Sequence, residues 1–324
     1  MPERPRYRPP RWLAAPHVMN LSLLWPRGGV PRAHGERVLV DVGDGDRVLL
    51  HFAPPRVAGG TVAVIVHGFT SSADARLVRS LARKCAARGF GVARVNTRGS
   101  GASLPFTRRL AHAGLEADLC AVLAALQRRA PGSSFALLGI SMGGNVALRA
   151  AAALAAGKGP RLSCVAGLSP VVDVARCARD CDTAPHARLY RAVFLRSLRA
   201  RVAALDRAHG LGIDRRALAA VRTLRAFDEL YTAPLWGHAS ADEYWARASA
   251  LPVLDAIEVP ILAIAARDDL LVPYDSLRPL RRRAGVRFLA TAKGGHCAFV
   301  ARARGADEDR YWAENRIVEF LGAP

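Results

Sequence analysis

FALLGISMGGNVALRAAAALAA, residues 135–156, joins an apolar run to an alanine-rich run through a serine flanked by glycines. The first part predicts a buried strand and the second predicts a helix. A serine at so sharp a strand-to-helix turn needs strained backbone angles, and glycines on either side leave room for the two elements to approach. Residues 139–143 therefore fit the G-x-S-x-G nucleophile elbow, which would present the hydroxyl of Ser141 above a sheet.

Short apolar runs recur on both sides of this stretch, and most pairs are spaced widely enough for a helix between them. Continuous apolar strands are those buried on both faces of a parallel sheet. Strands are predicted at residues 61–67, 91–96, 135–140, 163–169, 260–266 and 286–291, and helices at 73–88, 114–129, 142–156 and 309–321. A Gly-Asp-Gly turn between residues 36–42 and 46–52 predicts an antiparallel hairpin ahead of them. Eight strands in this order predict an α/β-hydrolase fold, a mostly parallel sheet with helices on both faces.

One segment, residues 173–250, does not alternate, because it contains Arg-rich and Ala-rich helical patterns and no convincing strand. It lies between the sixth and seventh expected strands, so it would cover the carboxyl ends of the strands, where open α/β sheets bind ligands. We interpret it as a helical cap or lid; an insertion without gating is the alternative. Residues 36–172 and 251–324 would form the hydrolase core, with residues 1–35 as an N-terminal extension packed on it.

The net charge of +20 would attract polyanions, but the basic residues are arginines spread over the whole chain. Because no recognition helix, zinc-finger spacing or RNA-binding signature accompanies the charge, we predict no nucleic-acid partner. Cys177 and Cys181 are one helical turn apart, but no second pair with metal spacing follows, so neither a metal nor an organic cofactor is expected.

The first 29 residues are basic but interrupted by prolines, and they lack a long apolar core. They fit neither a secretory signal nor a membrane span. We therefore predict a cytoplasmic protein with reduced cysteines. Arg11, Trp12, Trp25 and Arg27 would suit peripheral contact with a membrane, although packing of this segment over the domain is the favoured interpretation.

A serine hydroxyl is a poor nucleophile near neutral pH, so Ser141 needs a base within hydrogen-bond reach and a carboxylate that orients the base. In this fold the expected chain order is serine, acid, histidine. His296 follows the last expected strand on the glycine-rich loop KGGHCAFV, which is the right place for the base. The loop ARDDLLVP offers two acids, and its D-x-x-V-P pattern favours Asp269 over Asp268, which would hydrogen-bond the loop.

An acyl-transfer site also needs an oxyanion hole, a set of donors that stabilise the charge developing on the carbonyl oxygen. The backbone N–H of Met142 directly follows the nucleophile and is one donor. The segment HGFTSS, residues 67–72, follows the third expected strand and would supply the N–H of Phe69 as the other. His67 is interpreted as a structural residue that shapes this turn.

Seven segments, spread in order over nearly the whole chain, resemble the YheT-like branch of the α/β-hydrolases, which also contains membrane-anchored abhydrolase-domain proteins. They are RPPRWLAAPHVMN, HGFTSS, NTRGSG, GISMGGN, FDELYTAPLWGHASADEYWARAS, ARDDLLVP and GGHCAFV. The resemblance implies that Ser141, Asp269 and His296 form a catalytic triad and that the protein hydrolyses carboxylic esters. Some relatives act on lipid esters, so the expected substrate is a small-molecule or lipid ester. HVMN at residues 17–20 departs from the H-x-Q-T expected in relatives, and this departure concerns substrate recognition more than the triad.

Two other functions are compatible with the same residues. A thioesterase or acyltransferase would form the same acyl-enzyme with another leaving group or acceptor, and a catalytically silent hydrolase fold would bind a ligand or partner. Asp228 and Glu229 could suggest a glycosidase pair, but adjacent residues normally point apart, so we interpret them as a structural anchor beneath the cap.

Overall fold

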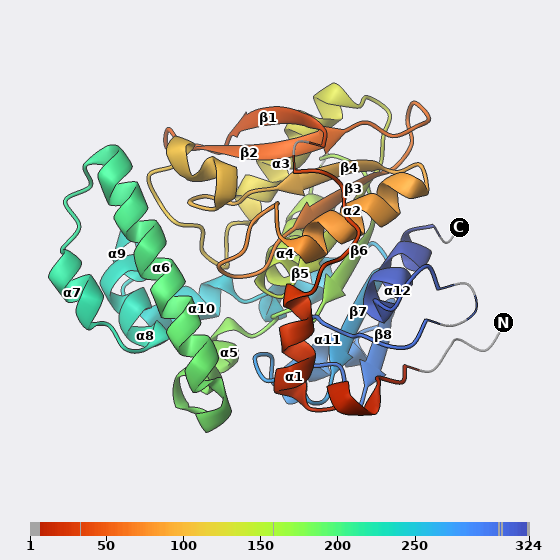
Figure 1. Ribbon diagram of the computed structural model, residues 1–324. Coiled ribbons are helices and arrows are strands. Elements are labelled where there is room, and N and C mark those ends of the chain that lie inside the picture. The colour runs from red at the N-terminus through yellow and green to blue at the C-terminus, as the bar shows by residue number, and fades with distance from the viewer. Residues whose placement is uncertain (1–6, 33, 158, 304, 306, 323–324) are drawn as a thin grey trace.

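The apolar runs of the sequence form one eight-stranded sheet in the computed structural model, which describes residues 7–32, 34–157, 159–303, 305 and 307–322 (Figure 1). The strands are β1 (Glu36–Asp41), β2 (Arg47–Ala53), β3 (Val62–Val66), β4 (Gly91–Val95), β5 (Phe135–Ile140), β6 (Leu162–Leu168), β7 (Ile261–Ala266) and β8 (Val286–Thr291). Their order is β1-β2-β4-β3-β5-β6-β7-β8. Strand β2 runs antiparallel to β1 and β4, and all other neighbours are parallel. The predicted hairpin and the mostly parallel sheet are confirmed.

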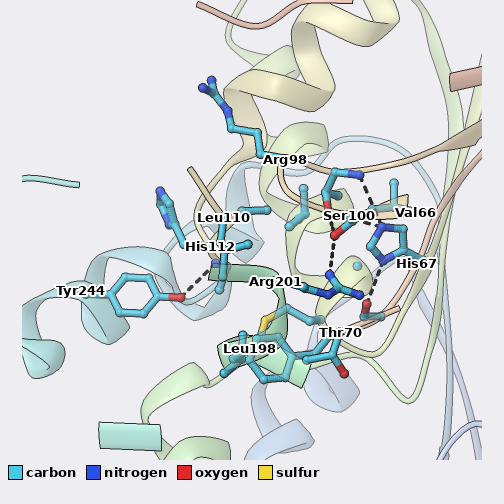
Figure 2. Close-up of a pocket in the computed structure, with 18 residues that line it drawn as sticks. Val66, His67, Thr70, Arg98, Ser100, Leu110, His112, Leu198, Arg201 and Tyr244 are labelled. Carbon is cyan, nitrogen blue, oxygen red and sulfur yellow. Dashed lines mark hydrogen bonds between the residues drawn. The ribbon is translucent and has the colours of Figure 1, made fainter. Parts of the chain in front are cut away.

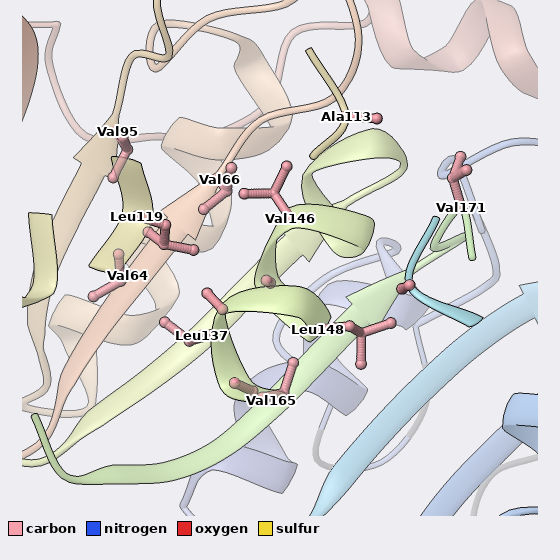
Figure 3. Packing of buried hydrophobic residues seen from close by; sticks show 14 of the residues in the cluster. Val64, Val66, Val95, Ala113, Leu119, Leu137, Val146, Leu148, Val165 and Val171 are labelled. Carbon is pink, nitrogen blue, oxygen red and sulfur yellow. The ribbon is translucent and has the colours of Figure 1, made fainter. Parts of the chain in front are cut away.

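Helices cover both faces of this sheet. They are α2 (Arg76–Ala87), α3 (Glu116–Arg129), α4 (Met142–Ala155), α11 (Arg278–Arg282) and α12 (Trp312–Leu321). Successive side chains of a strand point to opposite faces. Val64 and Val66 of β3 therefore belong to one buried cluster with residues of α3 and α4, whereas Ile65 belongs to a second cluster with residues of α2 and α12. Figure 3 shows Val146 of α4 beside Val66 in the first cluster.

Two helices begin three residues later than the sequence predicts. The chain before α2 is a turn in which the N–H of Ala73 donates to Oδ1 of Asn96 at 3.0 Å. Before α12, the N–H of Tyr311 donates to Oδ1 of Asp309 at 2.9 Å. In both places a side chain accepts a backbone N–H and holds the preceding residues in a turn, which periodicity does not reveal.

Between β6 and β7 the described chain contains helices and no strand. The helices are α5 (Val174–Thr183), α6 (Arg188–His209), α7 (Arg215–Ala220), α8 (Leu224–Phe227), α9 (Ala233–Leu235) and α10 (Ala241–Ala248). Figure 1 shows α6 to α10 grouped at one side of the sheet. Leu195, Leu198 and Val202 of α6 share a buried cluster with Leu224 and Phe227 of α8, so the insertion has an apolar centre of its own.

The N-terminal segment includes the short helix α1 (Pro16–Leu21) and packs against the C-terminal part of the chain. Leu13 and Met19 form a buried cluster with Ala298, Val300 and Tyr311. Residues 1–6 and 33 of the expected N-terminal extension lie outside the described residues. None of the helices that the structure describes is long and apolar enough to cross a membrane.

Candidate active site

The turn between β5 and α4 holds Ser141 in an unusual backbone conformation. Its φ is 53° and its ψ is −117°, and such angles cost about 1–3 kcal/mol for a non-glycine residue. Two hydrogen bonds to the neighbouring chain hold it there: its N–H donates to the carbonyl of Leu168 at 2.9 Å, and its own carbonyl accepts from the N–H of Val171 at 3.1 Å. The side chain therefore starts from a fixed position.

The glycines around Ser141 are required by close backbone contacts. A Cβ on Gly139 would lie 2.4 Å from the carbonyl oxygen of Gly143, and a Cβ on Gly143 would lie 2.4 Å from the carbonyl oxygen of Val66. No larger residue fits at either position without moving the backbone. Strand β5 thus turns directly into α4, as the sequence predicts.

His296 lies between Ser141 and Asp269. Its Nε2 is 2.9 Å from Oγ of Ser141, and its Nδ1 is 2.9 Å from Oδ2 and 3.1 Å from Oδ1 of Asp269. Since Nδ1 carries the proton that the carboxylate accepts, Nε2 is free to accept the hydroxyl proton. Burial by itself lowers the pKa of His296, but the Asp269 carboxylate outweighs it, and the pKa lies well above its usual range.

In the loop after β7, the two candidate acids, Asp268 and Asp269, have different hydrogen-bond partners. Oδ1 of Asp269 accepts the N–H groups of Leu271 at 2.9 Å and Val272 at 3.0 Å, which fixes the carboxylate facing the imidazole. Asp268 instead accepts the N–H of Gly295 at 3.0 Å, so it holds the histidine loop from the other side. Asp269 is therefore the acid that contacts His296.

Asn20, at the end of HVMN, is a residue of this site that sequence reasoning did not identify. Its Oδ1 accepts the backbone N–H of His296 at 2.6 Å, and its Nδ2 donates to the hydroxyl of Tyr190 on α6 at 2.9 Å. A Cβ on Gly295 would lie 2.4 Å from the same Oδ1, so a glycine is needed where the two segments meet. The only sequence signal was the departure of HVMN from the pattern of relatives.

The loop after β3 carries the expected oxyanion donors. Because β3 and β5 pair with Val66 beside Gly139, this loop lies next to the serine turn. In the described chain the backbone N–H of Phe69 has no acceptor. Met142 is the first residue of α4, so its N–H has no partner within the helix. Both residues line the cavities beside Ser141.

His67 holds that loop in place. The N–H of Thr97 donates to its Nε2 at 3.3 Å, so Nδ1 carries the proton and donates to the carbonyl of Gly68 at 2.8 Å. Burial lowers the pKa of His67 to about 4, which keeps the ring neutral. His67 therefore shapes the turn, and in the described chain it makes no hydrogen bond to Ser141 or Asp269.

Two cavities meet beside the serine. One is mainly apolar, includes about 660 Å³ of space with its open mouth, and extends under the helical insertion. The other includes about 550 Å³ and is bordered by the loops after β3 and β4 (Figure 2). Four residues line both cavities: Phe69, Met142, Leu198 and Tyr244.

Asp228 borders the apolar cavity, but its carboxylate is engaged with the insertion. It accepts from Nε1 of Trp245 at 2.8 Å and from Oγ1 of Thr232 at 2.6 Å. Burial raises its pKa to about 6. Glu229 lies 3.6 Å from Arg225 instead, so the two acids do not face one another as a glycosidase pair would.

Comparison with known proteins places the chain in a family. Residues 62–303 match a family described as alpha/beta hydrolase fold. An Escherichia coli K12 protein named "Putative esterase YheT" is 28% identical over 289 residues, which are 87% of this chain and 83% of the relative. Monoacylglycerol lipase of Saccharomyces cerevisiae is 25% identical over 80% of this chain and 58% of the lipase. The solved structure of the Pyrococcus furiosus esterase Pf2001 has a TM-score of 0.60 at 18% identity, with 99% of this chain and 98% of that chain covered.

Proposed function

The chain belongs to the α/β-hydrolase fold family and is YheT-like, and from this premise we propose that it hydrolyses carboxylic esters through an acyl-enzyme on Ser141. The observation that carries the proposal is the continuous hydrogen-bonded series Ser141–His296–Asp269. Relatives named as esterase and monoacylglycerol lipase support a lipid or other small-molecule ester as the substrate.

In the proposed reaction, Nε2 of His296 takes the hydroxyl proton while Oγ of Ser141 attacks the ester carbonyl carbon. The N–H groups of Phe69 and Met142 stabilise the negative charge on the carbonyl oxygen. The imidazolium, held by Asp269, then gives its proton to the leaving alcohol oxygen as the C–O bond breaks. Water attacks the acyl-enzyme in the same way, with His296 first accepting its proton and then returning a proton to Oγ.

The apolar cavity supports an acyl group as its occupant. Its lining includes Val171, Val174 and Leu224 together with Ser141. Burying each methylene of an acyl chain there contributes about 0.8 kcal/mol. We propose residues 173–250 as the cap that forms one wall of this cavity, residues 36–172 and 251–324 as the catalytic core, and residues 1–35 as an extension that supports the histidine loop. A cytoplasmic location stays a prediction.

A lipid surface is the proposed partner of the side where α1 and α6 meet. The hydroxyl of Tyr190 on α6 lies 3.1 Å from Nδ1 of His17, so the two helices are neighbours. Large apolar side chains are exposed on α6 and on α1 with the short turns on either side of it: Trp12, Leu21, Leu24, Leu189 and Val193. Apolar side chains among arginines suit the interface of an anionic membrane.

Labelling with a fluorophosphonate probe tests the proposed activity, because the probe reacts with a serine only where a base activates it. We expect the wild type to be labelled and Ser141→Ala to remain unlabelled. Ester turnover should fall by about four to six orders of magnitude in the variant. A folded wild-type protein that neither reacts with the probe nor hydrolyses esters would refute the proposal and favour a binding protein with a hydrolase fold.

A further inference from the structure

Arg201 reaches from the helical insertion into the second cavity beside the serine. It lies on α6, and its guanidinium donates from Nη1 to Oγ of Ser100 at 2.6 Å and from Nη2 to the carbonyl of Ser71 at 2.8 Å. Figure 2 shows the guanidinium next to Ser100 at the cavity. The two acceptors lie in the loops after β4 and β3, so the core fixes the position of the guanidinium.

The charge of Arg201 has no carboxylate partner in the part of the chain that the structure describes. The arginines buried in the core are different: Arg94, Arg98 and Arg316 each lie within 4 Å of an aspartate or glutamate. Burial lowers the pKa of Arg201, and no nearby anion counteracts this effect. A guanidinium has five N–H donors, so two bonds leave three without an acceptor in the described chain. A partly buried guanidinium that has free donors and no carboxylate partner is well suited to bind an anion.

No other group at this cavity supplies the missing negative charge. Arg98, the other charged lining residue, contacts Asp46 at 2.7 Å and Asp118 at 2.8 Å, and Asp46 also lies 3.7 Å from Arg109, so these two arginines and two aspartates balance one another. His112 is uncharged at neutral pH, because burial and the nearby His238 lower its pKa to about 3. The cavity therefore carries one uncompensated positive charge, and that charge is close to the proposed oxyanion loop, which includes Phe69.

We propose that Arg201 binds an anionic group on the alcohol part of the ester substrate, a phosphate or a carboxylate, while the acyl chain occupies the apolar cavity. Helix α6 supports this placement of the two substrate parts in different cavities. Leu198 lines both cavities, whereas Arg201, nearly one turn later, lines only the second. A guanidinium held by its neighbours is suited to bidentate contact with phosphate or carboxylate oxygens. This substrate class rests on the proposed ester hydrolysis.

The test uses pairs of esters that differ only in the anionic group. The first pair is 1-decanoylglycerol and 1-decanoylglycerol 3-phosphate; the second is the decanoyl ester of 3-hydroxybutyrate and the same compound as its methyl ester. Release of decanoate gives kcat/KM for each, and the measured quantity is the ratio of anionic to neutral ester. Arg201→Met removes the charge with little change in length. Arg207→Met is the matched control, because it removes an exposed arginine from the same helix outside the cavities.

We expect the wild type and Arg207→Met to prefer at least one anionic ester by about 10- to 100-fold, the value of a charge-assisted hydrogen bond, and Arg201→Met to lose that preference. The pair that shows the preference identifies phosphate or carboxylate as the group. A wild-type ratio near one for both pairs, or a preference kept in Arg201→Met, would overturn the proposal.

A second measurement on the wild type tests the proposal even if Arg201→Met does not fold. Glycerol 3-phosphate should slow fluorophosphonate labelling of the wild type more than glycerol does, and equal effects would count against Arg201 as an anion site. If Ser141 is labelled but the anionic and neutral esters are hydrolysed with equal kcat/KM, only the proposal of an anionic substrate is refuted. Absence of both labelling and hydrolysis would remove the proposed function and, with it, the substrate class.

Discussion

Replacing Asn20 with alanine should show whether this residue positions His296 for catalysis or only stabilises the fold. Asn20 is 9% exposed, and its Oδ1 is the acceptor for the His296 N–H at 2.6 Å. After the substitution that N–H either stays buried without a partner or the loop moves to find one. Leaving a buried donor unsatisfied costs about 1–3 kcal/mol. If the whole cost falls on alignment of the imidazole with Ser141, the rate falls by about 5- to 150-fold.

The assay is steady-state hydrolysis of an ester, with the free energy of unfolding measured by denaturant titration. Since Asn20 lines neither cavity, we expect kcat to fall and KM to change little. Tyr190→Phe is the control, because it removes only the hydroxyl that Asn20 Nδ2 contacts and leaves the bond to His296. A kcat for Asn20→Ala within about twofold of wild type, together with a lower free energy of unfolding, would show that the contact is structural only and refute the reasoning.

The other predictions concern the base and the membrane. The pKa of His296 is raised by Asp269, and catalysis needs the neutral imidazole, so kcat/KM should rise with pH along a limb that lies above pH 6.5. Asp269→Asn should move this limb to lower pH and reduce the plateau by about 10⁴-fold, whereas a limb that stays in place would contradict the assignment. Co-sedimentation with anionic vesicles should weaken with added salt and with the double substitution Leu21→Ser/Leu189→Ser. Val57→Ser, which changes another exposed apolar residue, should leave it unchanged. Equal binding by the wild type and both variants would count against the proposed surface.

The sheet could be predicted from the sequence because its strands are short apolar runs with few competing interpretations. Strand β5 has the predicted bounds, β3 is one residue shorter than predicted at each end, and β4 is one residue shorter at its C-terminal end. The serine turn was equally evident, since Gly139 and Gly143 are needed by contacts within a few residues of Ser141 or with the adjacent strand. Local patterns carry this kind of information well.

Contacts between distant segments could not be predicted in the same way. Asn20 and His296 are 276 residues apart, and Arg201 and Ser100 are 101 apart. Nothing in the helical period of α6 distinguishes Arg201 from the other arginines of that helix, which face solvent or backbone carbonyls. Its role is visible only once the loops after β3 and β4 lie opposite it. The preference for Asp269 over Asp268 rested on a loop pattern, and the hydrogen bonds of each carboxylate give it a physical basis.

The bond between Asn20 and His296 also has a consequence for the order in which the molecule is completed. During synthesis Asn20 is made long before the backbone group that it holds, because 276 residues separate it from His296. Contacts of such sequence separation form slowly. Refolding should therefore recover sheet structure first and the proposed activity later, with newly made chains remaining inactive until Asn20 and His296 have come together.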